Sequence, residues 1–434
     1  MNTLIKNANI ITMESEQKVI KNGYVGITDD RIVYVGEELP EDFWPQRILD
    51  CRGGAVLPGL INAHTHSPMV LLRSYADDLP LQEWLFNRIF PVEDKLTSED
   101  IYWASMLGTM EMIRSGITCF ADMYYFMDEV AKVVSKVGIR ANLSRGLQCF
   151  DDNIDPLQDR RLLENEQLFK DWEGESNGRI RVFLGPHSVY TCTPSYLEYI
   201  VDLAQRLGTG IHIHVSETLK ENEECLEKYG KTPVRHLYDH GIFNCPSIAA
   251  HCVHVSEEDM SLLKEKNVSV VYNPGSNLKL GSGIAPVTSM MERGINVALG
   301  TDGASSNNNL NMFEEIHLAA LLSKGVKQQP TNIKAYEALE MATVNGAKAL
   351  GWDKDIGMIK PGMKADIIIV NLNKPHFYPM HNIISNMVYS AQAGDVETLL
   401  VDGKIIMDKG EFKTIDEEEV YYNIKKIGKE LAYR

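Results

Sequence analysis

Two histidines one residue apart end an apolar run in the stretch "VLPGLINAHTHSPM", residues 56–69. Side chains two residues apart on a strand point to the same face, so His64 and His66 can converge on one point. Such a pair can bind a metal ion, or it can close a strand through ordinary hydrogen bonds to the backbone. The pair alone favours neither interpretation.

Two later runs also end in residues that can bind a metal ion or move protons. In "GIHIHVSE", His214 lies nearer the end of the run than His212 and is the better ligand candidate, whereas His212 is expected in the core with a satisfied hydrogen bond. Glu217 follows closely; it can overhang a metal, or it can be an acid that balances a helix dipole. His251 closes the run in "SIAAHCVHV".

An aspartate completes this set. Asp302 follows the apolar run of "INVALGTDG" and precedes a glycine, where its carboxylate can face a metal or form an Asx turn. Histidines at the ends of three runs and an aspartate after a fourth are better explained by one site than by separate structural roles. Three histidines and a carboxylate suit Zn²⁺ with a position open for water, and Fe²⁺ is the alternative ion. We expect one divalent metal ion per chain.

Eight short apolar runs, each followed by a stretch with helical spacing, must position these residues. The runs cover residues 56–62, 117–121, 139–144, 180–185, 210–215, 247–251, 268–272 and 297–301. Helices are expected after Thr193-Pro194, and after Ser256 as an N-cap. This alternation predicts an α/β fold, a (β/α)₈ TIM-type barrel, in which chemistry takes place at the C-terminal ends of the strands.

The two ends of the chain have a different texture, with alternating polar and apolar residues. The N-terminal stretches are "TLIKNANIITM", "GYVGITDDRIVYVG" and "QRILDCRG", and the C-terminal ones are "ADIIIVNLN", "NMVYSA" and "ETLLVDGKIIMDKGEF", in which Asp402-Gly403 fits a tight hairpin turn. They predict a small β-sandwich domain built from both termini. We expect residues 1–55 and 360–434 to form it, together with a terminal helix, around a barrel of residues 56–359.

The amino-acid composition limits the classes of binding partner that we expect. The formal net charge is -17 at pH 7, and no block of lysines and arginines offsets it locally. This charge repels phosphate backbones and anionic lipids, so neither nucleic acid nor membrane is an expected partner. No secretory signal and no apolar segment of about 20 residues is evident. Seven scattered cysteines without a CxxC pair indicate a reduced, cytoplasmic protein, for which the sequence permits a homo-oligomer.

Four motifs resemble the amidohydrolase superfamily, in the subgroup with one metal ion: "PGLINAHTH", "HIHVSE", "AHCVH" and "GTDGASSNNN". The resemblance covers nearly the whole chain, including the split β-domain. Within the superfamily, "LLRSYADDLPLQEWLFNRIFPVE", "GPHSVYTCT" and "NPGSNLKLGSGIAP" are most similar to the 5′-methylthioadenosine/S-adenosylhomocysteine deaminases. The s-triazine hydrolases and guanine deaminases share parts of this pattern.

By matching position, the resemblance implies a ligand set of His64, His66, His214 and Asp302. It also implies that Glu217 and His251 lie beside the bound water. Members with two metal ions carry a carboxylated lysine at the end of the fourth barrel strand. Here that run ends "VFLGPHSVY", with His187 and no lysine, which indicates a single metal ion.

The resemblance further implies which residues hold the substrate. The acid that matches Glu93 binds ribose hydroxyls, and a carboxylate suits two vicinal hydroxyl donors; without this match Glu93 would be interpreted as a solvated acid at a helix end. His187 is expected to contact the purine or its sugar, and Arg145 a charged substrate tail. A second tail arginine could be either Arg160 or Arg161.

Two weaker candidates complete the substrate set. Trp84 can pack against the nucleoside, although an aromatic residue in "EWLFNRIF" is on sequence alone more often part of the core. Ser306 is a weaker polar candidate for contact with the substrate.

These parts predict a hydrolytic reaction. A divalent cation lowers the pKa of its bound water from about 15.7 towards about 7. Asp302 can take the water's proton, His251 can polarise the nucleophile, and Glu217 can protonate a ring nitrogen such as N1 of adenine. Attack at C6 and loss of ammonia then replace the exocyclic amine with a carbonyl.

The main hypothesis is therefore a zinc-dependent hydrolase of C–N bonds in cyclic amidines. It would deaminate 5′-methylthioadenosine and S-adenosylhomocysteine to the inosine derivatives, in methionine-sulfur salvage. One alternative keeps the metal chemistry but acts on adenosine, guanine or an s-triazine. Another is a non-catalytic scaffold, which the presence of all four ligands and of Glu217 and His251 disfavours.

Overall fold

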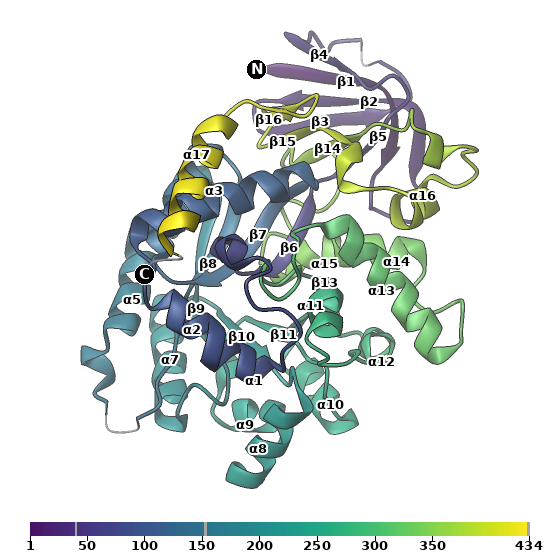
Figure 1. Cartoon of the computed structure of the whole chain (residues 1–434). Coiled ribbons are helices and arrows are strands. Elements are labelled where there is room, and N and C mark those ends of the chain that lie inside the picture. The colour runs from purple at the N-terminus through teal and green to yellow at the C-terminus, as the bar shows by residue number, and fades with distance from the viewer. Residues whose placement is uncertain (40, 152–153, 432–434) are drawn as a thin grey trace.

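The computed structural model describes residues 1–39, 41–151 and 154–431 and contains two β-sheets (Figure 1). The first sheet has eight strands in sequential order, each parallel to its neighbour. They are β6 (Leu60–Thr65), β7 (Ile117–Tyr124), β8 (Arg140–Leu147), β9 (Ile180–Pro186), β10 (Ile211–Val215), β11 (Ser247–His251), β12 (Ser269–Tyr272) and β13 (Asn296–Leu299). The predicted barrel is confirmed.

The first and last strands of this sheet meet just beyond β13. There the backbone N–H of Asp302 donates to the carbonyl oxygen of His64 at 3.0 Å, and the N–H of Thr301 donates to the Asn62 side chain at 2.9 Å. These bonds bring the ends of the first and eighth strands together, so that the barrel is nearly closed. A metal site that needs residues from both strands thereby becomes feasible.

Helices surround the barrel (Figure 1). They are α1 (Leu81–Trp84), α2 (Phe90–Glu93), α3 (Ser98–Arg114), α4 (Met127–Val137), α5 (Arg160–Trp172), α6 (Glu175–Gly178), α7 (Pro194–Leu207), α8 (Leu219–Tyr229), α9 (Pro233–Asp239), α10 (Glu257–Glu265), α11 (Pro274–Lys279), α12 (Val287–Glu292), α13 (Met312–Lys327), α14 (Ala335–Met341), α15 (Val344–Ala349), α16 (Ile383–Tyr389) and α17 (Glu417–Leu431). Helices α1 to α12 lie in the connections between the barrel strands, and α13 to α17 follow β13. In the described residues, no helix is long and apolar enough to cross a membrane.

Local sequence explains where these helices begin and end. Helix α7 starts at Pro194 as predicted, buries Leu197, Ile200 and Val201 at helical spacing, and is capped after Leu207 by Gly208 with a φ of 69°. Helix α10 starts after Ser256, whose side chain accepts a hydrogen bond from the N–H of Asp259 in a capping box. Both predicted helix starts are therefore confirmed.

The second sheet combines the two ends of the chain, as predicted. Its strands are β1 (Asn2–Ile11), β2 (Val19–Thr28), β3 (Arg31–Gly36), β4 (Arg47–Asp50), β5 (Ala55–Pro58), β14 (Ile367–Val370), β15 (Val396–Val401), β16 (Lys404–Asp408) and β17 (Glu411–Phe412). Strand β5 pairs in parallel with β1 and antiparallel with β14, so it joins the N-terminal and C-terminal strands. Residues from both groups, such as Ile5, Val25, Ile367 and Leu400, share one buried cluster.

The two sheets meet within one predicted run, residues 56–62. Strand β5 ends at Pro58 and β6 begins at Leu60, so the run is divided at Gly59. A Cβ at Gly59 would lie 2.0 Å from the Thr118 hydroxyl oxygen, so only glycine fits this close approach to β7. The exact domain limits of 1–55, 56–359 and 360–434 stay a prediction.

Two details of the C-terminal strands can be compared with the sequence. Asp402 and Gly403 join β15 to β16 with φ values of 48° and 70°, which is the tight hairpin turn predicted there. The prediction of a strand at "NMVYSA" was wrong, because this stretch lies largely in α16 (Ile383–Tyr389). Its buried residues Ile384, Met387 and Val388 follow helical spacing, and Asn382 caps the helix by accepting from the N–H of Ser385.

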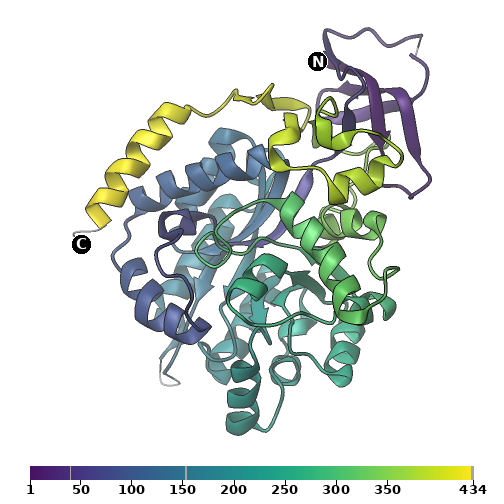
Figure 2. The same ribbon diagram turned by 45° about the vertical axis from the view of Figure 1, so that its right-hand side comes forward.

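Buried charges connect the small domain to the barrel. Arg140, at the start of β8, is 1% exposed and donates to Asp366 at 2.9 Å and to Asp402 at 2.7 Å. On the outside, α17 lies along α3 (Figure 2), where Arg114 donates to Glu417 at 2.7 Å. These contacts hold the terminal segments against the barrel.

Candidate active site

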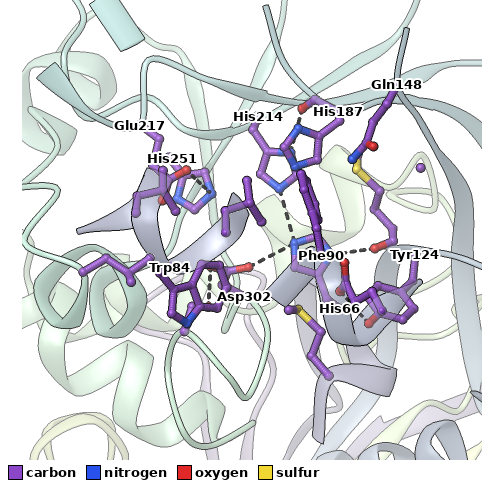
Figure 3. A pocket seen from close by; sticks show the side chains of 18 of the residues that line it. His66, Trp84, Phe90, Tyr124, Gln148, His187, His214, Glu217, His251 and Asp302 are labelled. Atoms are coloured by element: carbon purple, nitrogen blue, oxygen red, sulfur yellow. Dashed lines mark hydrogen bonds and ion pairs between the residues drawn. The ribbon is translucent and has the colours of Figure 1, made fainter. Parts of the chain in front are cut away.

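A group of five side chains gathers at the C-terminal ends of four barrel strands. They are His64 of β6, His66 just after it, His214 of β10, His251 of β11 and Asp302 after β13. Nε2 of His66 lies 3.2 Å from Oδ1 of Asp302 and 3.3 Å from Nε2 of His214 (Figure 3). Nε2 of His64 lies 3.4 Å from the same Oδ1. The structure therefore brings the four predicted ligands together.

Backbone carbonyls orient two of these imidazoles. Nδ1 of His66 donates to the carbonyl oxygen of Met123 at 2.5 Å, and Nδ1 of His214 donates to that of His187 at 2.7 Å. Because a carbonyl only accepts, both Nδ1 atoms carry hydrogen, and in the neutral rings Nε2 is a lone pair directed into the group. Nδ1 of His64 lies 2.8 Å from Nε2 of His212, so His212 is the buried, hydrogen-bonded histidine that its position in the strand predicted.

Two serines orient the carboxylate of Asp302. Oδ2 accepts hydrogen bonds from the Ser276 hydroxyl at 2.6 Å and the Ser306 hydroxyl at 2.8 Å, which leaves Oδ1 facing the histidines. Burial raises the pKa of Asp302, but the adjacent His64 and His66 outweigh it and hold the pKa well below its usual range. Asp302 therefore stays ionised, and Ser306 contacts this carboxylate as well as lining the pocket.

These donors fit a divalent cation. Two inward-facing Nε2 lone pairs 3.3 Å apart repel each other unless a cation or a proton lies between them. Nε2 of His64 is buried and has no hydrogen-bond partner among the described residues. A cation bound to three imidazole nitrogens and one carboxylate oxygen would satisfy all these atoms. The residues that would hold it are His64, His66, His214 and Asp302.

Glu217 and His251 face each other beside this group (Figure 3). Nε2 of His251 lies 3.9 Å from Oε2 of Glu217, and Nδ1 of His251 lies 2.9 Å from the Asn277 amide nitrogen. Burial, with the charge of Asp302, raises the pKa of Glu217 well above its ordinary value. Glu221 holds the chain here by accepting from the N–H of Glu217 at 2.7 Å. A protonated Glu217 can act as an acid towards a bound ring.

The same pocket carries a second acid. Glu93, from α2, is 7% exposed and accepts a hydrogen bond from the Tyr124 hydroxyl at 2.6 Å. Burial raises the pKa of Glu93 to about 7. Trp84 and His187 line the same pocket, and Nδ1 of His187 lies 3.0 Å from the Thr191 hydroxyl oxygen. The predicted substrate residues Trp84, Glu93, His187 and Ser306 all line this pocket.

Arg145 is placed differently. It does not line the central pocket but a neighbouring cavity, which shares Glu93, Tyr125 and Gln148 with it. The Nε of Arg145 donates to Glu164 at 2.9 Å. Arg160 and Arg161 line the same cavity, so the structure groups both alternatives with Arg145.

The sequence interpretation missed several residues that hold the functional groups in place. They are Tyr124, Ser276, Asn277 and Glu221, together with the pocket residues Tyr125, Gln148 and Tyr190. The motif "NPGSNLKLGSGIAP" had been used only for family resemblance, yet it supplies Ser276 and Asn277. Position alone gave a signal for Tyr124, because it ends β7 and therefore lies at the barrel mouth.

Comparison with known proteins agrees with this geometry. The profile of the amidohydrolase family matches residues 55–406, and that of the BsNagA composite domain matches residues 2–49. The chain belongs to the amidohydrolase family. This amidohydrolase is 54% identical to the 5-methylthioadenosine/S-adenosylhomocysteine deaminase of Thermoanaerobacter pseudethanolicus, over all of both chains. It is 52% identical to the enzyme of the same name from Acetivibrio thermocellus, over 99% of this chain and all of the other.

Solved structures are similar over the same length. An adenosine deaminase from Xanthomonas campestris with bound zinc aligns with a TM-score of 0.94 and 33% identity, covering 100% of this amidohydrolase and 99% of that chain. The atrazine chlorohydrolase of Arthrobacter aurescens, complexed with zinc, aligns with a TM-score of 0.91 and 24% identity, covering 98% and 100% of the two chains. The second likeness shows the fold alone. Zinc in the adenosine deaminase and the His/Asp group here support a divalent metal site.

Proposed function

We propose that this amidohydrolase deaminates 5′-methylthioadenosine and S-adenosylhomocysteine to the corresponding inosine derivatives, with release of ammonia. One observation carries the proposal: a single pocket is lined by the acid Glu217 beside the metal-binding group and by a second acid, Glu93, which Tyr124 holds by a hydrogen bond. The first suits an aminated ring and the second a ribose diol. Full-length relatives that carry this deaminase name support the same substrates.

The metal, when bound at His64, His66, His214 and Asp302, activates water at neutral pH as a Lewis acid. We propose Zn²⁺ rather than Fe²⁺, because three imidazoles and one carboxylate match the ligands that Zn²⁺ prefers. The serines Ser276 and Ser306 keep one carboxylate oxygen of Asp302 engaged, so the other oxygen stays directed at the histidines.

The chain's own side chains then move the protons. Glu217, whose pKa burial raises, donates a proton to N1 of the adenine ring, which makes C6 more electrophilic. Asp302 receives the proton of the attacking water, and His251 orients the nucleophile from its position 3.9 Å from Glu217. When the tetrahedral carbon at C6 collapses, a carboxylate returns a proton to the departing amine, and ammonia leaves.

The rest of the pocket holds the nucleoside in place. The Glu93 carboxylate accepts hydrogen bonds from the ribose hydroxyls, while Trp84 and His187 contact the ring and the sugar. Arg145 extends this binding to a charged 5′ tail. Of its two neighbours, Arg161 is the second tail arginine, because it lies beside the pocket residue Gln148 while the Arg160 side chain is 84% exposed.

Ammonia release from purified, zinc-loaded protein tests the proposal. The panel contains 5′-methylthioadenosine, S-adenosylhomocysteine, adenosine, guanine and an s-triazine. We expect release from the two thioethers, and metal analysis should find one zinc per chain. Activity on a free base or a triazine with none on any nucleoside would contradict the proposal. Protein that lacks both metal and activity would instead support the scaffold alternative.

The cellular setting is part of the same proposal. The inosine derivatives of the two thioethers would be formed in methionine-sulfur salvage. The seven cysteines, all free in the structure, fit a protein of the reducing cytoplasm. A homo-oligomer and the absence of nucleic acid partners stay predictions from the sequence. Gel filtration with light scattering measures the first directly.

A further inference from the structure

Two cavities adjoin the central pocket, and their charges differ. One shares Tyr190 with it and is lined by Glu221, Glu224 and Glu227 together with a single lysine. The other has a volume of about 400 Å³ and is lined by Arg145, Arg160 and Arg161 as well as by acids. A substrate carboxylate meets one lysine among three acids in the first cavity, but three arginines among four acids in the second, where the acids are Glu93, Asp94, Asp159 and Glu164. A negatively charged 5′ tail would therefore extend towards Arg145.

The guanidinium of Arg145 is already held in one orientation. Its Nε donates to Oε2 of Glu164 at 2.9 Å, it also donates to the carbonyl oxygen of Gly146, and it lies over the Tyr125 ring at 5.0 Å. The Arg145 side chain is 11% exposed and that of Glu164 is 34% exposed. This pair is thus partly shielded from solvent, and its charges interact more strongly than those of a fully exposed pair.

Glu164 differs from the other acids of the cavity in what it faces. Asp159 is engaged with its own helix and with Tyr196, because it caps α5 at the N–H of Arg161 and accepts from the Tyr196 hydroxyl at 2.6 Å. Glu164 instead bridges Arg145 and Arg160 with its two oxygens. It is the acid that pairs directly with Arg145.

We propose, on the basis of the deaminase function above, that Glu164 is a specificity-determining residue that lowers the preference for substrates with a negatively charged 5′ tail. A tail carboxylate that reaches Arg145 must share the guanidinium with Glu164 and tolerate its negative charge. An uncharged thioether tail meets no such repulsion. Glu164 thereby shifts the preference of the enzyme towards thioethers with an uncharged tail, such as 5′-methylthioadenosine.

Two matched substrates isolate this effect. They are 5′-S-(3-carboxypropyl)-5′-thioadenosine and its carboxamide, which differ in charge but hardly in size. The measured quantity is the ratio of kcat/KM for the carboxylate to kcat/KM for the carboxamide, in zinc-loaded holoenzyme. We expect E164Q to raise this ratio about three- to fivefold, as is typical of one partly exposed ion pair. Raised salt should reduce the gain.

A matched variant controls for overall charge. Glu166 lies on the same helix, is 31% exposed, and pairs with Lys170 at 2.7 Å away from the cavity lining. E166Q makes the same change in net charge and should leave the ratio as in the parent protein. An equal rise in E164Q and E166Q would overturn the proposal, as would an unchanged or lowered ratio in E164Q.

A double-mutant cycle tests whether Glu164 acts through Arg145. The effect of E164Q on the ratio should shrink in an R145Q background, because the shared partner is then gone and only direct repulsion by the Glu164 charge remains. An undiminished effect there would overturn the proposal. A parent protein that deaminates no adenosine thioether, including the carboxamide, would instead refute the proposed function. The two failures are therefore distinguishable.

Discussion

The central pocket combines residues from two different parts of the fold, which we call its metal-binding end and its nucleoside end. At the metal-binding end, His64, His214 and His251 are residues of barrel strands. His66, Glu217 and Asp302 each follow a barrel strand within three residues. At the nucleoside end, Glu93 and Trp84 come from the α1–α2 segment, which lies outside the barrel strands (Figure 1). Strand ends fix side chains through the sheet, whereas an inserted segment can change without disturbing the sheet. We expect the first end to determine the reaction and the second the substrate.

Removal of a ligand gives the largest expected effect and acts on every substrate alike. H214A should lower metal affinity by more than about 100-fold, because even outer partners of metal ligands cost 10–100-fold. Activity on 5′-methylthioadenosine and on adenosine should be lost together. Metal content by mass spectrometry and ammonia release measure the two effects. H240A, which removes a histidine paired with Glu198 on the surface, is the control. Full activity of metal-free H214A would contradict the expectation that the metal-binding end determines the reaction.

Loss of the acid at the metal-binding end comes next. E217Q should reduce kcat about 10²- to 10⁴-fold, the usual contribution of a positioned general acid, while zinc content stays at one per chain. The reduction should be similar for all nucleosides, since each needs the same ring protonation. E224Q, a change in an α8 residue that pairs with Lys220, should retain activity. If E217Q lost metal as well, Glu217 would belong to the ligand set instead.

The metal-binding end was predictable from the sequence for a geometric reason. Strand residues alternate faces and barrel chemistry lies at strand ends, so a polar residue after each apolar run has a known location. His64, His66, His214, His251 and Asp302 could be picked out on that basis. Their hydrogen-bond partners could not. The Ser276 hydroxyl reaches Asp302 from a residue 26 positions away, and only the packing of α11 brings it there.

The positions of the residues at the nucleoside end depend on tertiary packing, which the spacing of apolar residues in the sequence does not predict. Glu93 could be named only by family resemblance, because on sequence alone it was a solvated acid, whereas the structure shows it buried. Its hydrogen bond to Tyr124 joins residues 31 positions apart. The wrong strand at "NMVYSA" has a related cause: a short apolar run fits both a strand and a helix, and tertiary contacts decide.

Replacement of the second acid should affect substrates selectively. E93Q should lower kcat/KM for 5′-methylthioadenosine roughly 10- to 100-fold, because hydrogen bonds to a charged group contribute about 1.5–3 kcal/mol each. The loss should fall mainly on KM. The control is D94N, because Asp94 neighbours Glu93 and lines the cavity of Arg145 but not the central pocket. Unchanged nucleoside turnover in E93Q would refute the ribose assignment and favour a free base or a triazine.

The same residue predicts a pH dependence. Burial raises the pKa of Glu93 to about 7, the Tyr124 and Tyr125 hydroxyls and His66 lower it, and Asp94 raises it. Below this value Glu93 is protonated and loses one acceptor, so KM for a nucleoside should be high at low pH and fall as pH rises through about 7. In E93Q this dependence of KM should disappear. A KM that stays flat across this range in the parent protein would contradict the assignment.

The smallest expected effect comes from Tyr124, which holds Glu93 by a hydrogen bond. Tyr124 donates one hydrogen bond of 2.6 Å to Oε1 of Glu93, so Y124F should raise KM for 5′-methylthioadenosine about three- to tenfold, the usual contribution of one such bond, and leave kcat nearly unchanged. Because Tyr124 acts through the ribose-binding carboxylate, the effect should shrink for the 2′-deoxy analogue, which lacks one of the two hydroxyls. Equal effects on both substrates, or a fall in kcat, would mean that Tyr124 supports the metal-binding end through its neighbour Met123, whose carbonyl holds His66.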